Sequence, residues 1–234
     1  MSAAVSFGSS YICVGEGIRV WAEARALPLF RLLFLTSMLA AGCQNPVPGS
    51  LEVAAARFEG QSLAPIGDGD SVELTRPLQG GHVLFIGAYV RGASGSAGTI
   101  RGELRRGESD TGQPLLAPGA IIVYEERSTT LAELDAGVTP PSASPGWQQV
   151  RADVSDLANI PACPNFLPVE IPDRTLYLQV VYTDSKGNTG TTAKKVVPRC
   201  AQTDPVERNT CLCECHANYT IDRCFTSSDA GSAD

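Results

Sequence analysis

The chain has 234 residues, 18 of them Lys or Arg and 25 Asp or Glu, which gives a formal net charge of −7 at pH 7. An acidic surface without basic clusters argues against binding nucleic acid or anionic lipid headgroups. Glycine (23 residues) and proline (16) are abundant while aromatic residues make up only 6%, a composition typical of short strands joined by many turns. The composition therefore favours a β-rich protein with no nucleic-acid partner.

A short apolar run over residues 32–41 ends in small residues and a cysteine, Leu39-Ala40-Ala41-Gly42-Cys43, and follows Arg25 and Arg31. Positive charge, a brief apolar segment and then small residues are typical of a secretory signal. A membrane-spanning helix needs about 20 apolar residues, and Arg31 leaves only about half of that uninterrupted. An ordinary secretory signal or a structural segment are the alternatives that stay open.

The sequence Leu39-Ala40-Ala41-Gly42-Cys43 resembles the lipobox of bacterial lipoprotein precursors. The resemblance implies that the thiol of Cys43 receives a diacylglycerol, that the chain is cut before Cys43, and that the new amine is acylated with a chain such as palmitate. Two or three acyl chains anchor a protein stably, whereas one does so only marginally. By the sorting rule of some Gram-negative lipoproteins, Gln44 in place of Asp favours the outer membrane over the inner. The expected location is therefore the cell envelope, with the domain in the periplasm or on the membrane surface.

The chain divides into four predicted parts: a signal peptide (1–42), a lipid-anchored tether (43–50), a β domain (51–200) and a cysteine-rich tail (201–234). The region before the apolar run is longer than a signal needs, so our hypothesis is that translation begins near Val20 and residues 1–19 are not translated. Loss of residues 1–42 removes three arginines and two glutamates, and the net charge becomes −8. The remaining 192 residues are enough for one domain with appendages.

Alternating apolar residues and turn signals predict about eight short strands, and no window supports a long amphipathic helix. The predicted strands cover residues 51–58, 71–75, 82–90, 99–106, 120–125, 147–154, 175–183 and 189–197. Residues 82–90 are nearly all apolar and should form a central strand, whereas residues 99–106 should have one core face and one solvated face that carries Arg101, Glu103 and Arg105. Residues 155–159 are expected to form a helical turn and residues 160–173 an irregular loop. This pattern predicts an antiparallel β-sandwich or barrel.

The segment Tyr182-Thr183-Asp184-Ser185-Lys186-Gly187-Asn188-Thr189, followed by a strand that ends at Val196-Val197, resembles the last hairpin of bacterial immunoglobulin-like domains. In that hairpin an aspartate, a glycine and an asparagine shape the turn. The resemblance implies an immunoglobulin-like β-sandwich over residues 51–200. It implies no chemistry, because function resides in sites that a fold carries and not in the fold.

Beyond Cys43 the chain has an even number of cysteines, and four of them lie in the tail. They are Cys163, Cys200, Cys211, Cys213, Cys215 and Cys224. In an oxidising compartment this predicts three disulfides, with 15 allowed connectivities. A bridge between Cys163 and Cys200 would tie a loop to the end of the domain, and pairing of either cysteine with the tail is the alternative.

The tail also raises the alternative of a metal-binding or redox-active envelope protein. Its candidate ligands are Cys211, Cys213, Cys215, His216 and Cys224. The C-x-C-x-C spacing is tighter than that of usual zinc sites, and outside the cytosol disulfides are expected instead. We therefore expect no metal and no cofactor.

Catalytic and calcium sites have weaker support. His82 follows two glycines and is expected to be half-exposed, while the serine-rich loop 92–96 departs from the G-x-S-x-G motif of hydrolases. Acidic residues at Asp68, Asp70 and Asp184 offer oxygen ligands, but β-turns use the same residue types without a metal. No catalytic residue is predicted.

Together these features predict a lipid-anchored cell-envelope protein that acts as a non-enzymatic structural or binding module. Its partner would be another envelope protein or a polysaccharide, contacted through the loops of the sandwich. Aromatic residues are the usual anchors of such contacts, which makes Tyr89, Tyr124 and Trp147 candidates, although core packing is expected for each.

Overall fold

The computed structural model describes residues 50–109, 111–135, 137–139, 141–221 and 224. The predicted signal peptide, Cys43 and the tether up to residue 49 lie outside the described residues. Among the described residues no helix has the length and apolar character needed to cross a membrane.

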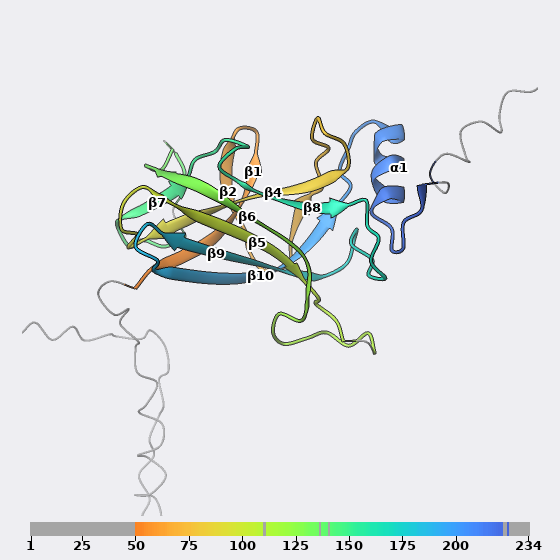
Figure 1. Cartoon of the computed structure of the whole chain (residues 1–234), viewed down its shortest axis with the longest axis horizontal. Coiled ribbons are helices and arrows are strands. Elements are labelled where there is room, and N and C mark those ends of the chain that lie inside the picture. Colours follow the sequence, from red (N-terminus) through yellow and green to blue (C-terminus); the bar gives the residue numbers. More distant parts are fainter. Residues whose placement is uncertain (1–49, 110, 136, 140, 222–223, 225–234) are drawn as a thin grey trace, which may run out of the picture. The chain divides into compact units, whose positions relative to one another are not determined.

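The described chain folds into strands and one short helix, as the sequence predicts for an all-β protein (Figure 1). The strands are β1 (Glu52–Glu59), β2 (Ser62–Pro65), β3 (Asp70–Glu73), β4 (His82–Arg91), β5 (Ala97–Arg105), β6 (Ile121–Ala132), β7 (Trp147–Val150), β8 (Ala158–Cys163), β9 (Leu176–Asp184) and β10 (Thr189–Arg199). The helix is α1 (Pro205–Glu214).

The strands form two layers that are continuous through β6. In one layer β2 pairs with β1, β1 with β4, and β4 with both β7 and β8; in the other the order is β6-β5-β9-β10-β3. Most of β6 pairs with β5, and its last two residues pair with β7 of the first layer. The run β1-β4-β8 corresponds to strands A, B and E of an immunoglobulin-like sandwich, and the run β5-β9-β10 corresponds to strands C, F and G. The strands β2, β3, β6 and β7 are additional to these two runs. All pairs are antiparallel except β3 with β10, which is parallel.

The core lies between the two layers, where the inward residues of β4, β5, β8 and β9 meet. Its fully buried side chains include Leu84, Ile86, Ile100, Leu104, Ile160 and Leu178. The two layers approach closely at Gly102 of β5, where an added Cβ would lie 2.8 Å from the Cδ1 atom of Ile160 in β8. A larger residue at position 102 would therefore push the layers apart.

The predictions for residues 151–173 need correction, and the strand predicted over residues 147–154 ends at Val150. The loop predicted over residues 160–173 is wrong at its start, because Ala158–Cys163 forms β8. The helical turn predicted over residues 155–159 is wrong at its end, because its last two residues belong to the same strand. Pro161 obscured this strand in the sequence. A proline is tolerated there because β8 pairs with β4 only and leaves its other side without a ladder.

Glu103 is also not solvated as predicted, since only 3% of it is exposed. Its two carboxylate oxygens lie 2.7 Å from Nε of Arg101 and 2.6 Å from Nε of Arg105. Each arginine is two residues from Glu103 in the sequence and therefore lies on the same face of β5. The ring of Tyr124 covers the Arg101 guanidinium at 4.4 Å. The alternation of β5 is correct, but its outer face is closed by this ion-paired row.

The predicted hairpin turn is confirmed, and the Asp184 carboxylate organises it. One oxygen accepts hydrogen bonds from the backbone N–H groups of Lys186 and Asn188, and the other accepts them from the Asn188 amide and from the backbone N–H of Ser94, each at 2.9 Å. These hydrogen bonds hold the pKa of Asp184 below its usual range, although burial acts to raise it. The bond from the Asn188 side chain has the largest effect. Asp184 therefore serves the turn and joins it to the β4–β5 loop.

Stability should depend on pH through this carboxylate. The folded-state pKa of Asp184 is lowered, so its contribution to stability is present above the unfolded pKa of about 4 and is lost as pH falls below it. We expect Asp184→Asn to lower the free energy of unfolding at pH 7 and to flatten its decline between pH 5 and pH 2. Urea denaturation across this range measures both effects, and parallel curves for the two proteins would contradict the prediction.

Candidate functional site

The tail begins with a helix that the sequence signals locally. The Asp204 carboxylate caps α1 by accepting hydrogen bonds from the backbone N–H groups of Val206 (2.8 Å) and Glu207 (2.9 Å), and Pro205 occupies the first helical position. An aspartate followed by proline and, three residues on, by glutamate is a helix-start pattern. The sequence therefore contains a local signal for the start of α1, although its ten residues are too few to form a long amphipathic pattern.

All six predicted disulfide cysteines are paired, which confirms the disulfide-rich tail. The pairs are Cys163–Cys215, Cys200–Cys211 and Cys213–Cys224. Cys163 ends β8 in one layer, and Cys200 directly follows β10 in the other. The bridge between Cys163 and Cys200 does not form, and the alternative, pairing with the tail, holds for both. The two inner disulfides thus attach α1 to both layers of the sandwich.

His82 lies under this helix and is fully buried, so the prediction that it is half-exposed is wrong. It is the first residue of β4 and pairs in register with Cys163 of β8. Its Nδ1 lies 3.0 Å from Oε2 of Glu214, the last residue of α1. Because that carboxylate accepts, Nδ1 carries the proton of a neutral imidazole and Nε2 presents its lone pair.

The other ring nitrogen of His82 is unsatisfied. Nε2 is buried and has no hydrogen-bond partner among the described residues. Burial lowers the pKa of the imidazole, and the charge of Glu214 offsets this only in part. A buried ring nitrogen without a partner costs free energy in a purely structural role, which makes His82 a candidate for function.

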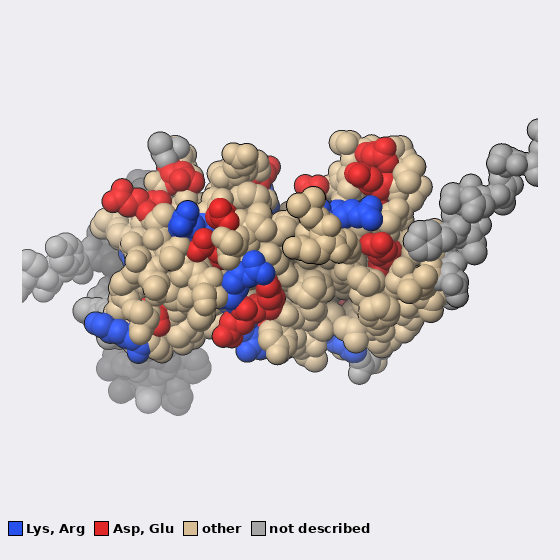
Figure 2. Space-filling view, turned by 45° about the horizontal axis from the view of Figure 1, so that its top comes forward, with Lys and Arg blue, Asp and Glu red and all other residues tan. Residues whose placement is uncertain are grey.

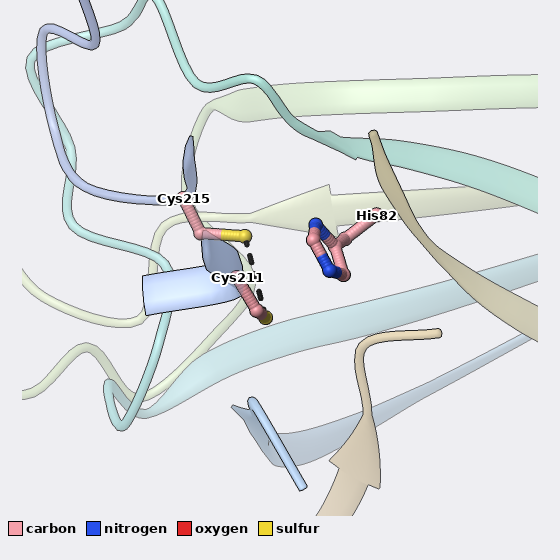
Figure 3. A group of neighbouring side chains, drawn as sticks. All are labelled: His82, Cys211 and Cys215. Carbon is pink, nitrogen blue, oxygen red and sulfur yellow. Dashed lines mark hydrogen bonds between the residues drawn. The ribbon is translucent and has the colours of Figure 1, made fainter. Parts of the chain in front are cut away.

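Two sulfur atoms lie beside this histidine (Figure 3). The Sγ atoms of Cys211 and Cys215 are 3.9 Å apart and belong to different disulfides. One ring nitrogen of His82 and these two sulfurs all lie within 4.8 Å of one another. All three residues are buried. We refer to His82, Cys211 and Cys215 as the histidine–sulfur cluster.

The metal ligands considered from the sequence are only partly brought together. Cys211 and Cys215 are adjacent, but Cys213 and Cys224 form a separate, partly exposed disulfide. The side chain of His216 is 61% exposed, with Nε2 3.8 Å from a Glu170 oxygen. Within the described residues, the histidine that joins the sulfurs is His82. Sequence reasoning missed it because His82 and its partner Glu214 are 132 residues apart.

His82 is not placed for the hydrolase arrangement weighed above. It begins β4, whereas Ser94 and Ser96 follow the end of that ten-residue strand, about 30 Å away along it. The backbone N–H of Ser94 is bonded to Asp184 in the hairpin turn. No nucleophile-and-base pair therefore arises from these residues.

The aromatic contact candidates differ in exposure. Tyr89 is fully buried, Trp147 is half-buried beneath the guanidinium of Arg91, and Tyr124 is 54% exposed. Sequence reasoning missed Phe166, which is 67% exposed and packs edge to face against Tyr219, with ring centroids 5.8 Å apart. This aromatic pair lies beside the end of α1, because the backbone N–H of Tyr219 and the carbonyl of Glu214 both bond to Asn165.

The charged side chains do not form an extended patch on the face drawn in Figure 2, where basic and acidic groups are interspersed. Elsewhere in the described structure too, charges of opposite sign are paired, as in the contacts of Arg127 with Glu125 and of Arg57 with Asp70. The surface of this face is thus of mixed charge.

The chain was compared with known proteins in three ways. No family model matches it. No curated protein matches it. No solved structure matches it.

The disulfides should differ in their effect on stability. Cys163–Cys215 closes a sequence separation of 52 residues and Cys213–Cys224 one of 11. Replacing the first pair by alanines should lower the free energy of unfolding by about 4 kcal/mol, and replacing the second by about 3 kcal/mol, because a longer closed loop restricts the unfolded chain more. Urea denaturation without reductant measures both values, and a larger loss for the Cys213–Cys224 pair would contradict the prediction.

Proposed function

We propose that this protein is a lipid-anchored module of a bacterial cell envelope, with a structural or binding role and no catalysis of its own. The observation that carries the proposal is the pairing of all six cysteines that follow Cys43. Persistent disulfides are typical of proteins outside the cytosol. Together with the lipobox-like segment that ends at Cys43, this pairing supports export followed by attachment through a lipid.

The two ends of the sandwich suit different tasks. An added Cβ at Gly92, after β4, would lie 2.9 Å from the carbonyl oxygen of Ser50, so the chain enters at the end of the sandwich that holds the β4–β5 loop. The helix α1 lies at the opposite end, over the start of β4 (Figure 1). Residues 44–50 can extend by at most about 25 Å, so a lipid on Cys43 would keep the entry end near the membrane. Within the sandwich, the α1 end is the one farther from Ser50 (Figure 1).

The α1 end also carries the features of a contact surface. Phe166 exposes most of its ring there, and Leu167 beside it is exposed as well. The disulfide Cys163–Cys215 fixes the segment that carries them. Exposed aromatic residues on a rigid support are typical contact residues for proteins and polysaccharides. We therefore assign partner binding to the α1 end and anchoring to the other.

Lipidation can be tested at a single residue. Cys43→Ser should abolish incorporation of a labelled fatty acid and release the protein from the membrane fraction, because Cys43 is the proposed acyl acceptor. Gln44→Ser, at the neighbouring residue, is the matched control and should leave both unchanged. Fatty-acid labelling with fractionation measures this, and labelling that persists in Cys43→Ser would refute the anchor.

The binding role can be tested by placing a photo-reactive phenylalanine analogue at either end. In place of Phe166, at the α1 end, it should give a defined adduct with an envelope protein or polysaccharide in intact cells. In place of the exposed Lys186, in the β9–β10 turn, it should give none, because that turn lies at the entry end. Equal adducts at both positions, or none at Phe166, would contradict the assignment.

A further inference from the structure

We propose that, after reduction of its two inner disulfides, the protein binds one Zn²⁺ ion through His82, Cys211 and Cys215. The inference goes beyond the proposed envelope role and does not depend on the lipid anchor. It differs from the metal site considered from the sequence, because the histidine comes from β4 and not from the tail.

The spacing of the sulfur atoms matches this ion. A tetrahedral Zn²⁺ with Zn–S bonds of about 2.3 Å holds two thiolates about 3.8 Å apart. The Sγ atoms of Cys211 and Cys215 are 3.9 Å apart although no bond joins them. Cys211 lies in the last turn of α1 and Cys215 caps that turn, with its N–H bonded to the carbonyl of Cys211, so the helix itself sets this distance.

His82 is prepared as a third ligand. Metal-binding histidines commonly donate the N–H of one ring nitrogen to a carboxylate, which orients the other nitrogen toward the metal. Glu214 accepts from Nδ1 of His82 in this way at 3.0 Å, and Nε2 has no partner among the described residues. Figure 3 shows the ring beside the two sulfurs. A metal would use the ring nitrogen that the folded protein leaves unsatisfied.

The fourth ligand is supplied by the same reduction. Cys163 and Cys200 are the disulfide partners of Cys215 and Cys211, and both are buried beside the cluster. Their thiols stay next to the two ligand sulfurs once the disulfides open, and either one completes a Cys₃His set. The outer disulfide, Cys213–Cys224, takes no part.

The chemistry balances with a dithiol reductant. Each disulfide takes two electrons and two protons and becomes two thiols, while the dithiol is oxidised to its own disulfide. The ion then binds the thiolate form and releases one proton from each coordinating thiol. Thiol–disulfide exchange with an oxidised dithiol restores the two disulfides, passes two electrons and two protons per bridge to that compound, and expels the ion. The segment that holds α1 to the sandwich would thus alternate between a covalent link and a metal link.

The test uses the full chain, reduced under argon with a phosphine and titrated with Co²⁺ as a spectroscopic substitute for Zn²⁺. We expect one equivalent to bind with thiolate-to-metal charge transfer and tetrahedral ligand-field bands, and Zn²⁺ to displace it. The oxidised protein should show neither band. His82→Gln should weaken binding at least tenfold and Glu214→Gln about tenfold, because the carboxylate orients the ligand. His216→Gln is the matched control and should bind as the unaltered protein does.

A second variant separates the cluster from the outer cysteines. Cys213→Ala combined with Cys224→Ala should keep the bands and the affinity, because neither residue is a proposed ligand. Absence of thiolate bands in the reduced protein, loss of binding in this double variant, or affinity unchanged by His82→Gln would each overturn the proposal. An unfolded reduced chain, detected by circular dichroism, would bind independently of His82 and would overturn it as well.

Discussion

The attachment of α1 by the two inner disulfides is the constraint on which this end of the molecule depends. A helix of ten residues is only marginally stable by itself in water. Here it is fixed to β8 through Cys163 and to the end of β10 through Cys200, so it closes the end of the sandwich from both layers. These two links keep the carboxylate of Glu214 against the imidazole of His82, and α1 covers this end of the core.

That closure also explains why a polar side chain sits in an apolar interior. The helix that covers His82 also carries its hydrogen-bond acceptor, Glu214. Two disulfides hold this helix in place, so the hydrogen bond of His82 depends on both of them. The interaction satisfies one ring nitrogen and leaves the other without a partner. A methionine or leucine would fill a purely structural position at lower cost, which is the physical ground for treating this histidine as functional.

Local patterns predicted most of the strands, while long-range pairing decided the site. The alternation along β5 and the β9–β10 hairpin were readable because a two-residue period and an Asp–Gly–Asn turn are encoded within a few residues. The strand β8 was missed because a proline such as Pro161 usually indicates a loop. The burial of Glu103 was missed because a hydrophobicity pattern does not show ion pairing with the flanking arginines. The partners of His82 were beyond reach, since only the folded chain brings β4 and α1 together.

The connectivity of the cysteines has a consequence for biogenesis. If the chain is exported as proposed, Cys163 and Cys200 would leave the translocation channel before any tail cysteine, and an oxidant that acts in order of emergence would join these two first. The native pattern instead joins each of them to a cysteine of α1 or its cap. For an exported chain, maturation to this pattern would then require either delayed oxidation or a disulfide isomerase. The yield of this small domain is thereby linked to the thiol-handling capacity of the compartment that receives it.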